Sequence, residues 1–166
     1  MLFNSVNFLF FLPAVFFLYW FVVNKDLRSQ NVLLLGASYF FYSCWDWRFL
    51  FLLMFSTLLD YFTGLKMQET DDKQRRKFWF WLSIIVNLSF LAVFKYYNFF
   101  VYSFTDAMRL LGLTVHPQTL NIVLPVGISF YTFHGLSYVI DIYNGRIKAE
   151  KDFISYALFV SFFPLL

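Results

Sequence analysis

The sequence carries little charge for its length. Only 14% of its 166 residues are Asp, Glu, Lys or Arg, whereas 60% are hydrophobic and 25% are aromatic. Because charged residues make up about a quarter of a soluble domain, this composition indicates an integral membrane protein with the lipid bilayer as its partner. The net charge of +3 lies in short connectors between apolar runs, where it serves membrane orientation. We therefore expect no nucleic-acid binding.

Residues that ligate metals or form disulfides are also scarce. Cys44 is the only cysteine, and His116 and His134 are the only histidines. This excludes an internal disulfide, a multi-thiolate metal site and a histidine-rich metal site. Glycine-rich phosphate loops and the Gly-x-Ser-x-Gly and His-Glu-x-x-His motifs are absent as well. The sequence therefore predicts no metal and no bound cofactor, and it shows none of these soluble-enzyme signatures.

What remains is a series of apolar runs, which predicts an all-α, polytopic membrane protein in one domain over residues 1–166. A hydrocarbon core of about 30 Å requires about 20 helical residues. The first run has this length, and no basic residue precedes it, so it is not typical of a cleaved signal peptide. Six transmembrane helices are expected, the last one truncated, at about 3–23, 31–47, 49–65, 78–98, 121–140 and 153–166.

The distribution of lysine and arginine predicts the orientation of these helices. With the N-terminus outside, the loops 24–30, 66–77 and 141–152 are cytoplasmic and contain two, five and three basic residues. The predicted outer connectors contain only Arg48 and Arg109. Because cytoplasmic loops are enriched in basic residues, we expect a multi-pass membrane protein with an extracytoplasmic N-terminus. Residues 105–120 are expected to form a short amphipathic or irregular outer connector.

Polar side chains interrupt the third and fifth predicted helices. Tyr131, His134, Tyr138 and Asp141 fall on one stripe of the fifth, and Asp60 lies within the third. By residue count Asp60 and His134 are each about 10 Å from the cytoplasmic edge, which permits a hydrogen bond between them. We interpret these five residues as lining a cavity or supporting one, with helix–helix packing as the alternative.

The ends of the last two helices carry further information. Pro125 and Gly127 predict a kink or break near the start of the fifth helix. The last predicted helix has only 14 residues, so it would stop within hydrocarbon after about 21 Å. We therefore expect the chain to be the N-terminal part of a longer polypeptide.

Several of these segments resemble one family of membrane enzymes. Residues 124–145 are the most distinctive, and similar stretches are spread along the whole chain: 1–5, 33–45, Asp60-Tyr61 with Gly64, 94–96, and Asp152-Phe153 followed by 162–164. Together they resemble the membrane-bound O-acyltransferase family, in particular its bacterial branch related to alginate O-acetyltransferase.

The resemblance implies a helical membrane core and an O-acyltransferase activity. Family members transfer an acyl group, typically acetyl, from a cytoplasmic donor such as acetyl-CoA toward an extracytoplasmic polysaccharide, often through an extracytoplasmic acyltransferase partner. Their catalytic histidine lies in the C-terminal half, so we expect it downstream of Leu166 and transfer no catalytic role to His134. The chain alone is then predicted to be inactive, and its helices to pack against the missing C-terminal half.

Two other readings of the apolar helices stay open at this stage. The chain could be a component of a transporter or channel in which the kinked, polar fifth helix lines the path. It could also be a non-catalytic assembly subunit whose helices serve only for packing.

Overall fold

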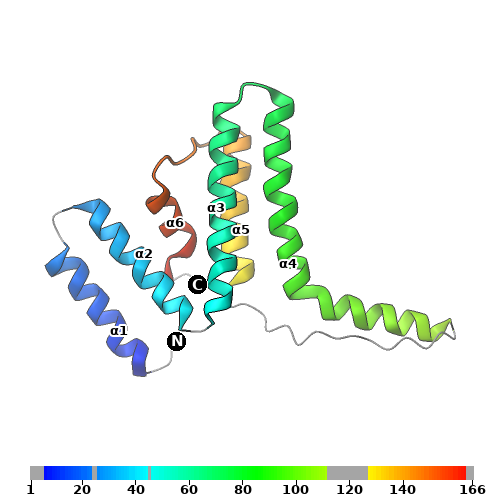
Figure 1. The fold of residues 1–166 in the computed structure, drawn as a ribbon, viewed down its shortest axis with the longest axis horizontal. Helices are drawn as coiled ribbons and strands as arrows, with labels where there is room; N and C mark the ends of the chain where they lie inside the picture. The colour runs from blue at the N-terminus through cyan, green and yellow to red at the C-terminus, as the bar shows by residue number, and fades with distance from the viewer. Residues whose placement is uncertain (1–5, 24–25, 45, 112–126, 164–166) are drawn as a thin grey trace.

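In the computed structural model, residues 6–23, 26–44, 46–111 and 127–163 are described, apart from the side chain at position 98. Within these ranges all regular structure is helical and no strand occurs, which confirms the predicted all-α class (Figure 1). The elements are α1 (Val6–Phe17), the π-helical turn η1 (Leu18–Val22), α2 (Leu27–Ser43), α3 (Trp47–Glu69), α4 (Lys73–Leu110), α5 (Ile128–Tyr143) and α6 (Phe153–Ser161).

Four of the helices begin directly after an aspartate. Asp26, Asp46, Asp72 and Asp152 precede α2, α3, α4 and α6, and each accepts a hydrogen bond from a backbone amide two or three residues further along. Such a cap satisfies one of the amides that the first helical turn leaves without a partner. Much of the chain's sparse acidic charge therefore defines where helices start.

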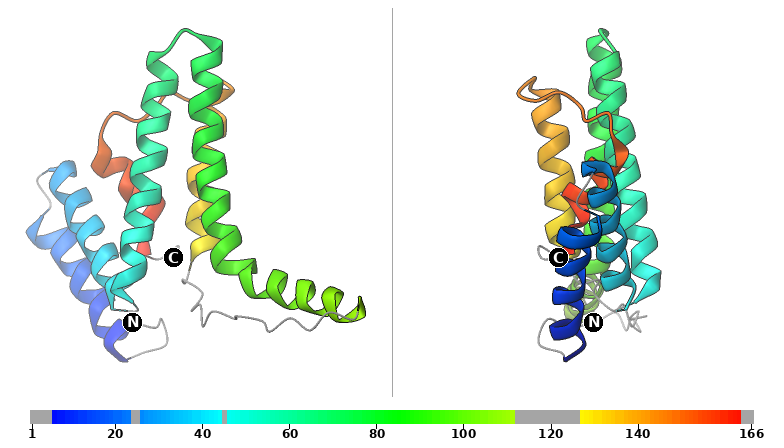
Figure 2. Two further views of the ribbon diagram at one scale, coloured as in Figure 1. Left: turned by 45° about the vertical axis from the view of Figure 1, so that its right-hand side comes forward. Right: turned by 90° about the vertical axis from the view of Figure 1, so that its left-hand side faces the viewer.

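The central part of the fold is a group of three long helices. α3, α4 and α5 lie side by side and each packs against the other two (Figures 1 and 2). Their interior contains fully buried apolar and aromatic side chains, among them Leu53 and Met67 of α3 and Tyr131 and Val139 of α5. α6 adds Tyr156 to the same cluster.

A second, smaller group lies beside the first. α1 and η1 form a hairpin with α2, and α6 packs against both α2 and α3, so that it joins the two groups. The buried side chains of this second group are Val15, Phe41 and Phe163, and Phe8 and Phe11 are packed against them. Aromatic rings dominate this smaller core.

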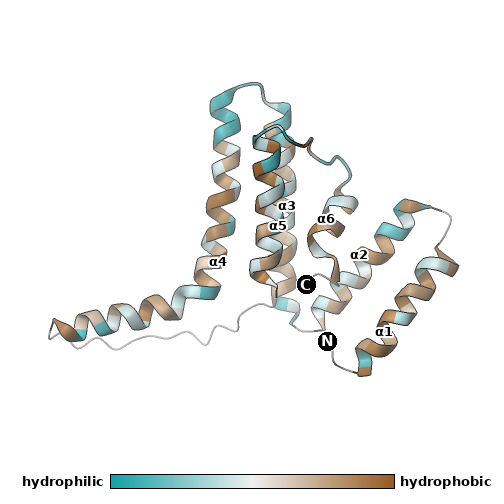
Figure 3. Ribbon diagram, turned by 180° about the vertical axis from the view of Figure 1, so that it is seen from behind, coloured by the Kyte–Doolittle hydropathy of each residue, from teal (hydrophilic) through white to brown (hydrophobic). Residues whose placement is uncertain are grey.

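Two described helices are long and apolar enough to cross a membrane. They are α3 and the first part of α4, Lys73–Tyr97, whereas Val6–Val22 is apolar but shorter. Hydrophilic residues gather at the end of the bundle where α3 and α4 join, and the middles of these helices are largely apolar (Figure 3). The predicted set of six transmembrane helices is thus not confirmed. In α3 and in the first part of α4, however, the apolar sequence does form a helix of membrane-spanning length.

The structure differs from the prediction on both sides of the predicted outer connector. α4 stays helical as far as Leu110, so the first residues of the expected connector 105–120 are a helix. α5 begins only at Ile128, after Gly127, whose φ of 74° lies in the left-handed region that a residue without a Cβ adopts readily. Gly127 therefore lies directly before the first residue of α5, and Pro125, the other residue of the predicted kink or break, lies outside the described residues.

Candidate functional site: a buried carboxylate among three helices

The carboxylate of Asp60 is the most enclosed charged group in the described part of the chain. Asp60 lies in the middle of α3 and is only 1% exposed. Its Oδ1 accepts a hydrogen bond of 2.5 Å from the Ser83 hydroxyl and one of 2.7 Å from the Asn87 side-chain amide, both from α4. These donors provide the compensation that a buried carboxylate requires.

The hydrogen bonds continue beyond Asp60 into a small network, which we call the Asp60 network and define as Ser56, Asp60, Ser83 and Asn87. The Ser56 hydroxyl donates to the amide oxygen of Asn87 at 2.5 Å, and the Asn87 amide also donates to the Ser83 carbonyl at 3.1 Å. Ser56 and Asp60 are four residues apart on α3, as are Ser83 and Asn87 on α4. The polar pair on α3 and the polar pair on α4 therefore face each other and satisfy each other's hydrogen-bonding groups.

α5 closes the third side of this network with a glycine. A Cβ built on Gly135 would overlap Oδ2 of Asp60 and lie 3.1 Å from its Cγ. A Cβ on Gly64 of α3 would lie 3.0 Å from Tyr138 and 3.0 Å from Ile142, both on α5. Small residues thus allow α3 and α5 to approach closely at two levels, as is common between helices in membranes.

The structure brings together only part of the predicted polar stripe. Tyr131 and Tyr138 are buried against neighbouring helices, but His134 and Asp141 are partly exposed at the edge of α5. Nδ1 of His134 lies 2.9 Å from the Phe130 carbonyl of its own helix, and Asp141 forms a 3.2 Å ion pair with Arg146. The face of α5 that meets Asp60 is centred on Gly135, one position past His134.

The hydrogen bond that equal depth permitted between Asp60 and His134 is therefore not formed. Asp60 is bonded to α4, whereas the His134 ring packs against Phe130 and Phe159 at centroid distances of 4.5 and 5.6 Å. The prediction missed Ser83 and Asn87 as the partners. A signal existed, since they are the polar pair at a four-residue spacing within the apolar run 78–94.

Two tyrosine hydroxyls hold the connector between α5 and α6. The Tyr61 hydroxyl donates to the Lys151 carbonyl at 2.6 Å, and the Tyr138 hydroxyl accepts from the Glu150 amide at 2.9 Å. The Tyr156 ring packs on that of Tyr138 with a centroid distance of 4.4 Å. The hydroxyl of Tyr156 is buried and has no hydrogen-bond partner among the described residues. These side chains fix where α6 begins.

The cap of α6 has a local electrostatic effect. The hydroxyl and the backbone amide of Ser155 donate to Asp152 at 2.7 and 3.1 Å, and together they lower the pKa of this carboxyl from its ordinary value of 3.8. Asp152 is partly exposed, so water screens the interaction. The charge of Asp152 therefore stabilises the first turn of α6 only weakly.

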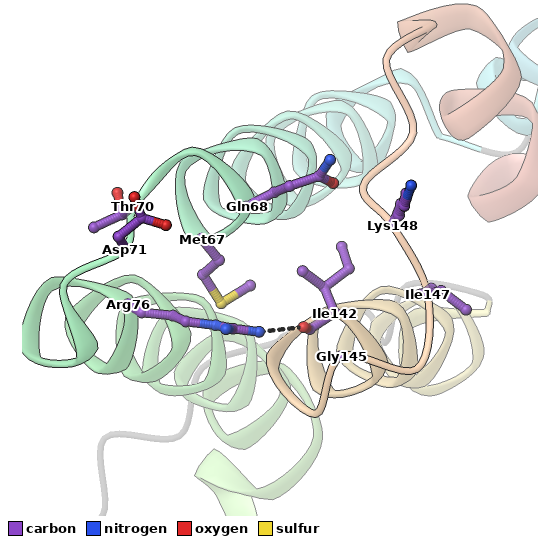
Figure 4. A pocket seen from close by; sticks show the side chains of 9 residues that line it. All are labelled: Met67, Gln68, Thr70, Asp71, Arg76, Ile142, Gly145, Ile147 and Lys148. Carbon is purple, nitrogen blue, oxygen red and sulfur yellow. Dashed lines mark hydrogen bonds between the residues drawn. The ribbon is translucent and has the colours of Figure 1, made fainter.

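A polar pocket of about 310 Å³ opens where the α3–α4 turn meets the end of α5 (Figure 4). Arg76 reaches across it and donates from Nη2 to the carbonyls of Ile142 and Tyr143 at 2.8 and 2.9 Å. These are among the last carbonyls of α5, where a positive charge is favoured by the helix dipole. Lys148 and Asp71 lie on the same pocket with opposite charges.

This arrangement makes the pocket a junction between elements more than an anion site. The Arg76 cation is already engaged with carbonyl oxygens, and its guanidinium lies 5.7 Å from the centre of the Tyr143 ring. Gln68 also contributes, because its side-chain oxygen accepts a hydrogen bond from the Ala149 amide. Within the described residues, no three His, Cys, Asp or Glu side chains are grouped so that they could hold a metal ion.

The fold and the site define a class: apolar helices with a hydrogen-bonded carboxylate and close glycine contacts in their interior are typical of polytopic helical membrane proteins. Comparison with known proteins specifies the class. The chain is 43% identical over its whole length to a Pseudomonas syringae protein named "Probable alginate O-acetylase AlgI", and 40% identical to the Pseudomonas aeruginosa protein of the same name. It is 33% identical to a Helicobacter pylori peptidoglycan O-acetyltransferase.

Over its whole length the chain is therefore related to proteins named as bacterial O-acetyltransferases, the relationship that its motifs predicted. All of its residues are covered by these alignments, but the chain spans only about a third of the length of the relatives, 32% for the two Pseudomonas proteins and 36% for the Helicobacter protein. No protein-family model and no solved structure matches the chain.

Proposed function

We propose that the chain is the N-terminal helical segment of an O-acetyltransferase that moves acetyl groups from a cytoplasmic donor, such as acetyl-CoA, toward an extracytoplasmic glycan. The observation that carries this proposal is the 43% identity to an alginate O-acetylase along the entire chain. The acceptor is then alginate or another polysaccharide, or peptidoglycan as the name of the Helicobacter relative suggests. The catalytic histidine and an extracytoplasmic acyltransferase partner lie outside this chain.

The proposed setting is the bacterial cytoplasmic membrane, with six transmembrane segments and the N-terminus outside. Three features support this topology: the apolarity of α3 and of Lys73–Tyr97, the hydrophilic turn between them, and the basic residues of the loops 66–77 and 141–152. In this setting the end of the bundle with Arg76 and Lys148 faces the cytoplasm. The opposite end, with Lys95, faces outward.

Within such an enzyme, the described helices provide a rigid wall and no reacting group. The Asp60 carboxylate is bonded through Oδ1 to two side chains of α4, so Asp60 is a structural residue that holds α3 against α4. Tyr131 and Tyr138 pack inside the bundle, which does not favour the alternative of a transporter with α5 along an open path. His134, bonded within α5, is proposed to support packing.

The test is complementation with the full-length gene in a bacterium deleted for its own alginate O-acetylase. We expect the wild-type gene to restore acetyl groups on the polysaccharide, measured by NMR after its purification. His134→Ala should retain most of this acetylation at equal membrane abundance, with His116→Ala as the matched control in an outer connector.

Two results would contradict the proposal in different ways. Failure of the wild-type gene to acetylate either polysaccharide or peptidoglycan would overturn the activity. Complete loss of acetylation in His134→Ala, with normal abundance, would instead place a catalytic residue inside this chain and refute the wall assignment.

A further inference from the structure

The last part of α4 leaves the bundle. α4 contains 38 residues and is therefore about 57 Å long, which exceeds the 40–45 Å of a whole bilayer including headgroups. Its apolar membrane-length segment ends at Tyr97. Figures 1 and 2 show that the helix bends at this level and that its last part runs across the direction of α3 and α5, away from the other helices. We call this last part, residues 99–110, the α4 arm.

The α4 arm has two different faces. Phe100, Phe104 and Met108 follow one another at intervals of four residues and form an apolar face. The two charged residues of the arm, Asp106 and Arg109, lie on the opposite side, next to the exposed Tyr102 and Leu110. Phe100 is 62% exposed and Phe104 is 58% exposed, so the described elements leave these two rings uncovered, whereas Met108 is partly buried. Asp106 and Arg109 form an exposed ion pair of 3.8 Å, which makes the polar face electrically neutral.

The bend lies beside residues that suit the border between lipid and water. Nζ of Lys95 lies 5.5 Å from the centre of the Tyr96 ring and 3.5 Å from the Ser129 hydroxyl at the start of α5. Lysine and tyrosine place an apolar stem or ring in lipid and a polar end in the headgroups. The helix therefore changes direction at the depth where a bilayer changes from hydrocarbon to water.

We propose that the α4 arm is an interfacial helix that lies in the outer leaflet's headgroup region, with Phe100, Phe104 and Met108 toward the acyl chains. This rests on the proposed membrane setting, because a helix that runs across a membrane-spanning bundle lies in the membrane plane. The spanning part of α4 also leaves apolar side chains uncovered, among them Ile85, Leu88 and Val93. One lipid surface therefore covers both parts.

Because the polar face of the arm is electrically neutral, the arm does not need anionic lipids to bind the membrane. Basic interfacial helices gain affinity from anionic headgroups, but an Asp106–Arg109 pair has no net charge to attract them. The arm is thus held by the apolar area it buries, about 5–10 Å below the headgroup surface, and a zwitterionic bilayer is sufficient. In the enzyme, such a helix would keep the outer end of α4 at constant depth beside the glycan-facing surface.

The test uses spin labels on the full-length protein in phosphatidylcholine nanodiscs. In a Cys44→Ser background, which removes the exposed free cysteine, single cysteines at Phe104 and Asp106 report the two faces of the arm, and one at Ile85 reports the spanning part. We expect the label at 104 to be severalfold more accessible to oxygen than to a water-soluble nickel complex, and the label at 106 to show the reverse. The label at 85 should be accessible to oxygen only.

The outcomes separate the arm from the membrane setting. One outcome is that the labels at 104 and 106 are equally accessible to the nickel complex while the label at 85 is accessible only to oxygen. The bundle would then span the bilayer with the arm in water, and the proposal would be wrong. If both arm labels are immobile and reach neither reagent, protein covers the arm instead of lipid. If the label at 85 is also accessible to nickel, the membrane setting itself fails.

Discussion

The two helix groups of this protein are held together by different interactions. In the group of α3, α4 and α5, Asp60 is bonded to two side chains of α4 and lies against a glycine of α5. In the group of α1, α2 and α6, ring contacts such as Phe11 with Phe163 at 5.4 Å predominate. One buried hydrogen bond, from the Phe163 amide to the Ser38 hydroxyl at 3.1 Å, joins α2 to the chain after α6. The first group is thus held mainly by hydrogen bonds to a buried carboxylate, and the second mainly by packed aromatic rings.

This difference matters most in a lipid environment. Burying an apolar ring gains little there, because lipid tails are as apolar as the protein interior, and packing contributes mainly van der Waals energy. Buried donors without a partner, by contrast, are costly in hydrocarbon. We therefore expect substitutions in the Asp60 network to destabilise the protein more than substitutions in the aromatic cluster of Phe8, Phe11, Phe41 and Phe163.

The largest effect is expected for Asp60→Ala. The substitution leaves the buried Ser83 hydroxyl and Asn87 amide without their acceptor, which costs about 3 kcal/mol of unfolding free energy for the two groups. Asp60→Asn, which keeps an acceptor oxygen, should lose clearly less. Steric trapping of the purified protein in bicelles measures both values. Equal stability of the alanine variant and the wild type would show that the network does not hold the helices together.

A pair of glycine substitutions compares the two groups directly. In Gly135→Ala the new methyl group meets the Asp60 carboxylate, so we expect a loss of about 1–3 kcal/mol from overpacking. No atom lies within 4 Å of a Cβ at Gly36 in α2, so Gly36→Ala should be neutral or gain up to about 1 kcal/mol from helix propensity. Thermal denaturation of both variants gives the signs. A loss in Gly36→Ala as large as that in Gly135→Ala would contradict the comparison.

A smaller effect is expected for Phe41→Leu in the aromatic cluster. A leucine retains most of the volume and all of the apolarity, so the loss should stay below about 1.5 kcal/mol. Phe40→Leu is the control, since Phe40 is more than half exposed. The same denaturation assay applies. If Phe41→Leu destabilised the protein as much as Asp60→Ala does, ring geometry would specify the second group as strictly as hydrogen bonds specify the first.

The smallest effect concerns the cap at Asp152, which links the two groups through α6. Because the folded state lowers the pKa of Asp152, its charge stabilises the fold above the ordinary pKa of 3.8, and this contribution is lost as the pH falls through the folded-state pKa. Asp152→Asn keeps a capping side chain but removes the charge. The variant should therefore melt slightly below the wild type at pH 7, and this difference should be smaller at pH 3. An identical difference at both pH values would exclude the charge as the cause.

Much of the fold follows from apolar runs and their polar borders. Helices occur where these runs were predicted, and aspartates such as Asp46 and Asp152 mark their beginnings because a side-chain cap satisfies free amides. The length of α4 was not foreseen. Lys95 resembles the end of a helix when only membrane length is considered, but neither lysine nor the tyrosines that follow it break a helix, and the backbone continues to Leu110.

The candidate site was predictable only in part, for a physical reason. Asp60 could be selected because an ionisable residue in an apolar run needs a partner. Depth alone suggested His134, but depth does not determine which helices are neighbours. The turn between Glu69 and Lys73 makes α3 and α4 neighbours, and residues equally far from the turn in such an antiparallel hairpin lie at the same level. Asp60 is nine residues before Glu69 and Ser83 is ten after Lys73, so counting from the turn would have found the pair.

The closure of the Asp60 network within one hairpin has a consequence for biosynthesis. Among the described residues, the donors to the carboxylate are Ser83 and Asn87 of α4, the helix synthesised directly after α3. The two helices can therefore leave the insertion machinery as a pair with the charge already shielded, before α5 exists. When α5 arrives, it needs to bring no partner for Asp60, only the empty space at Gly135.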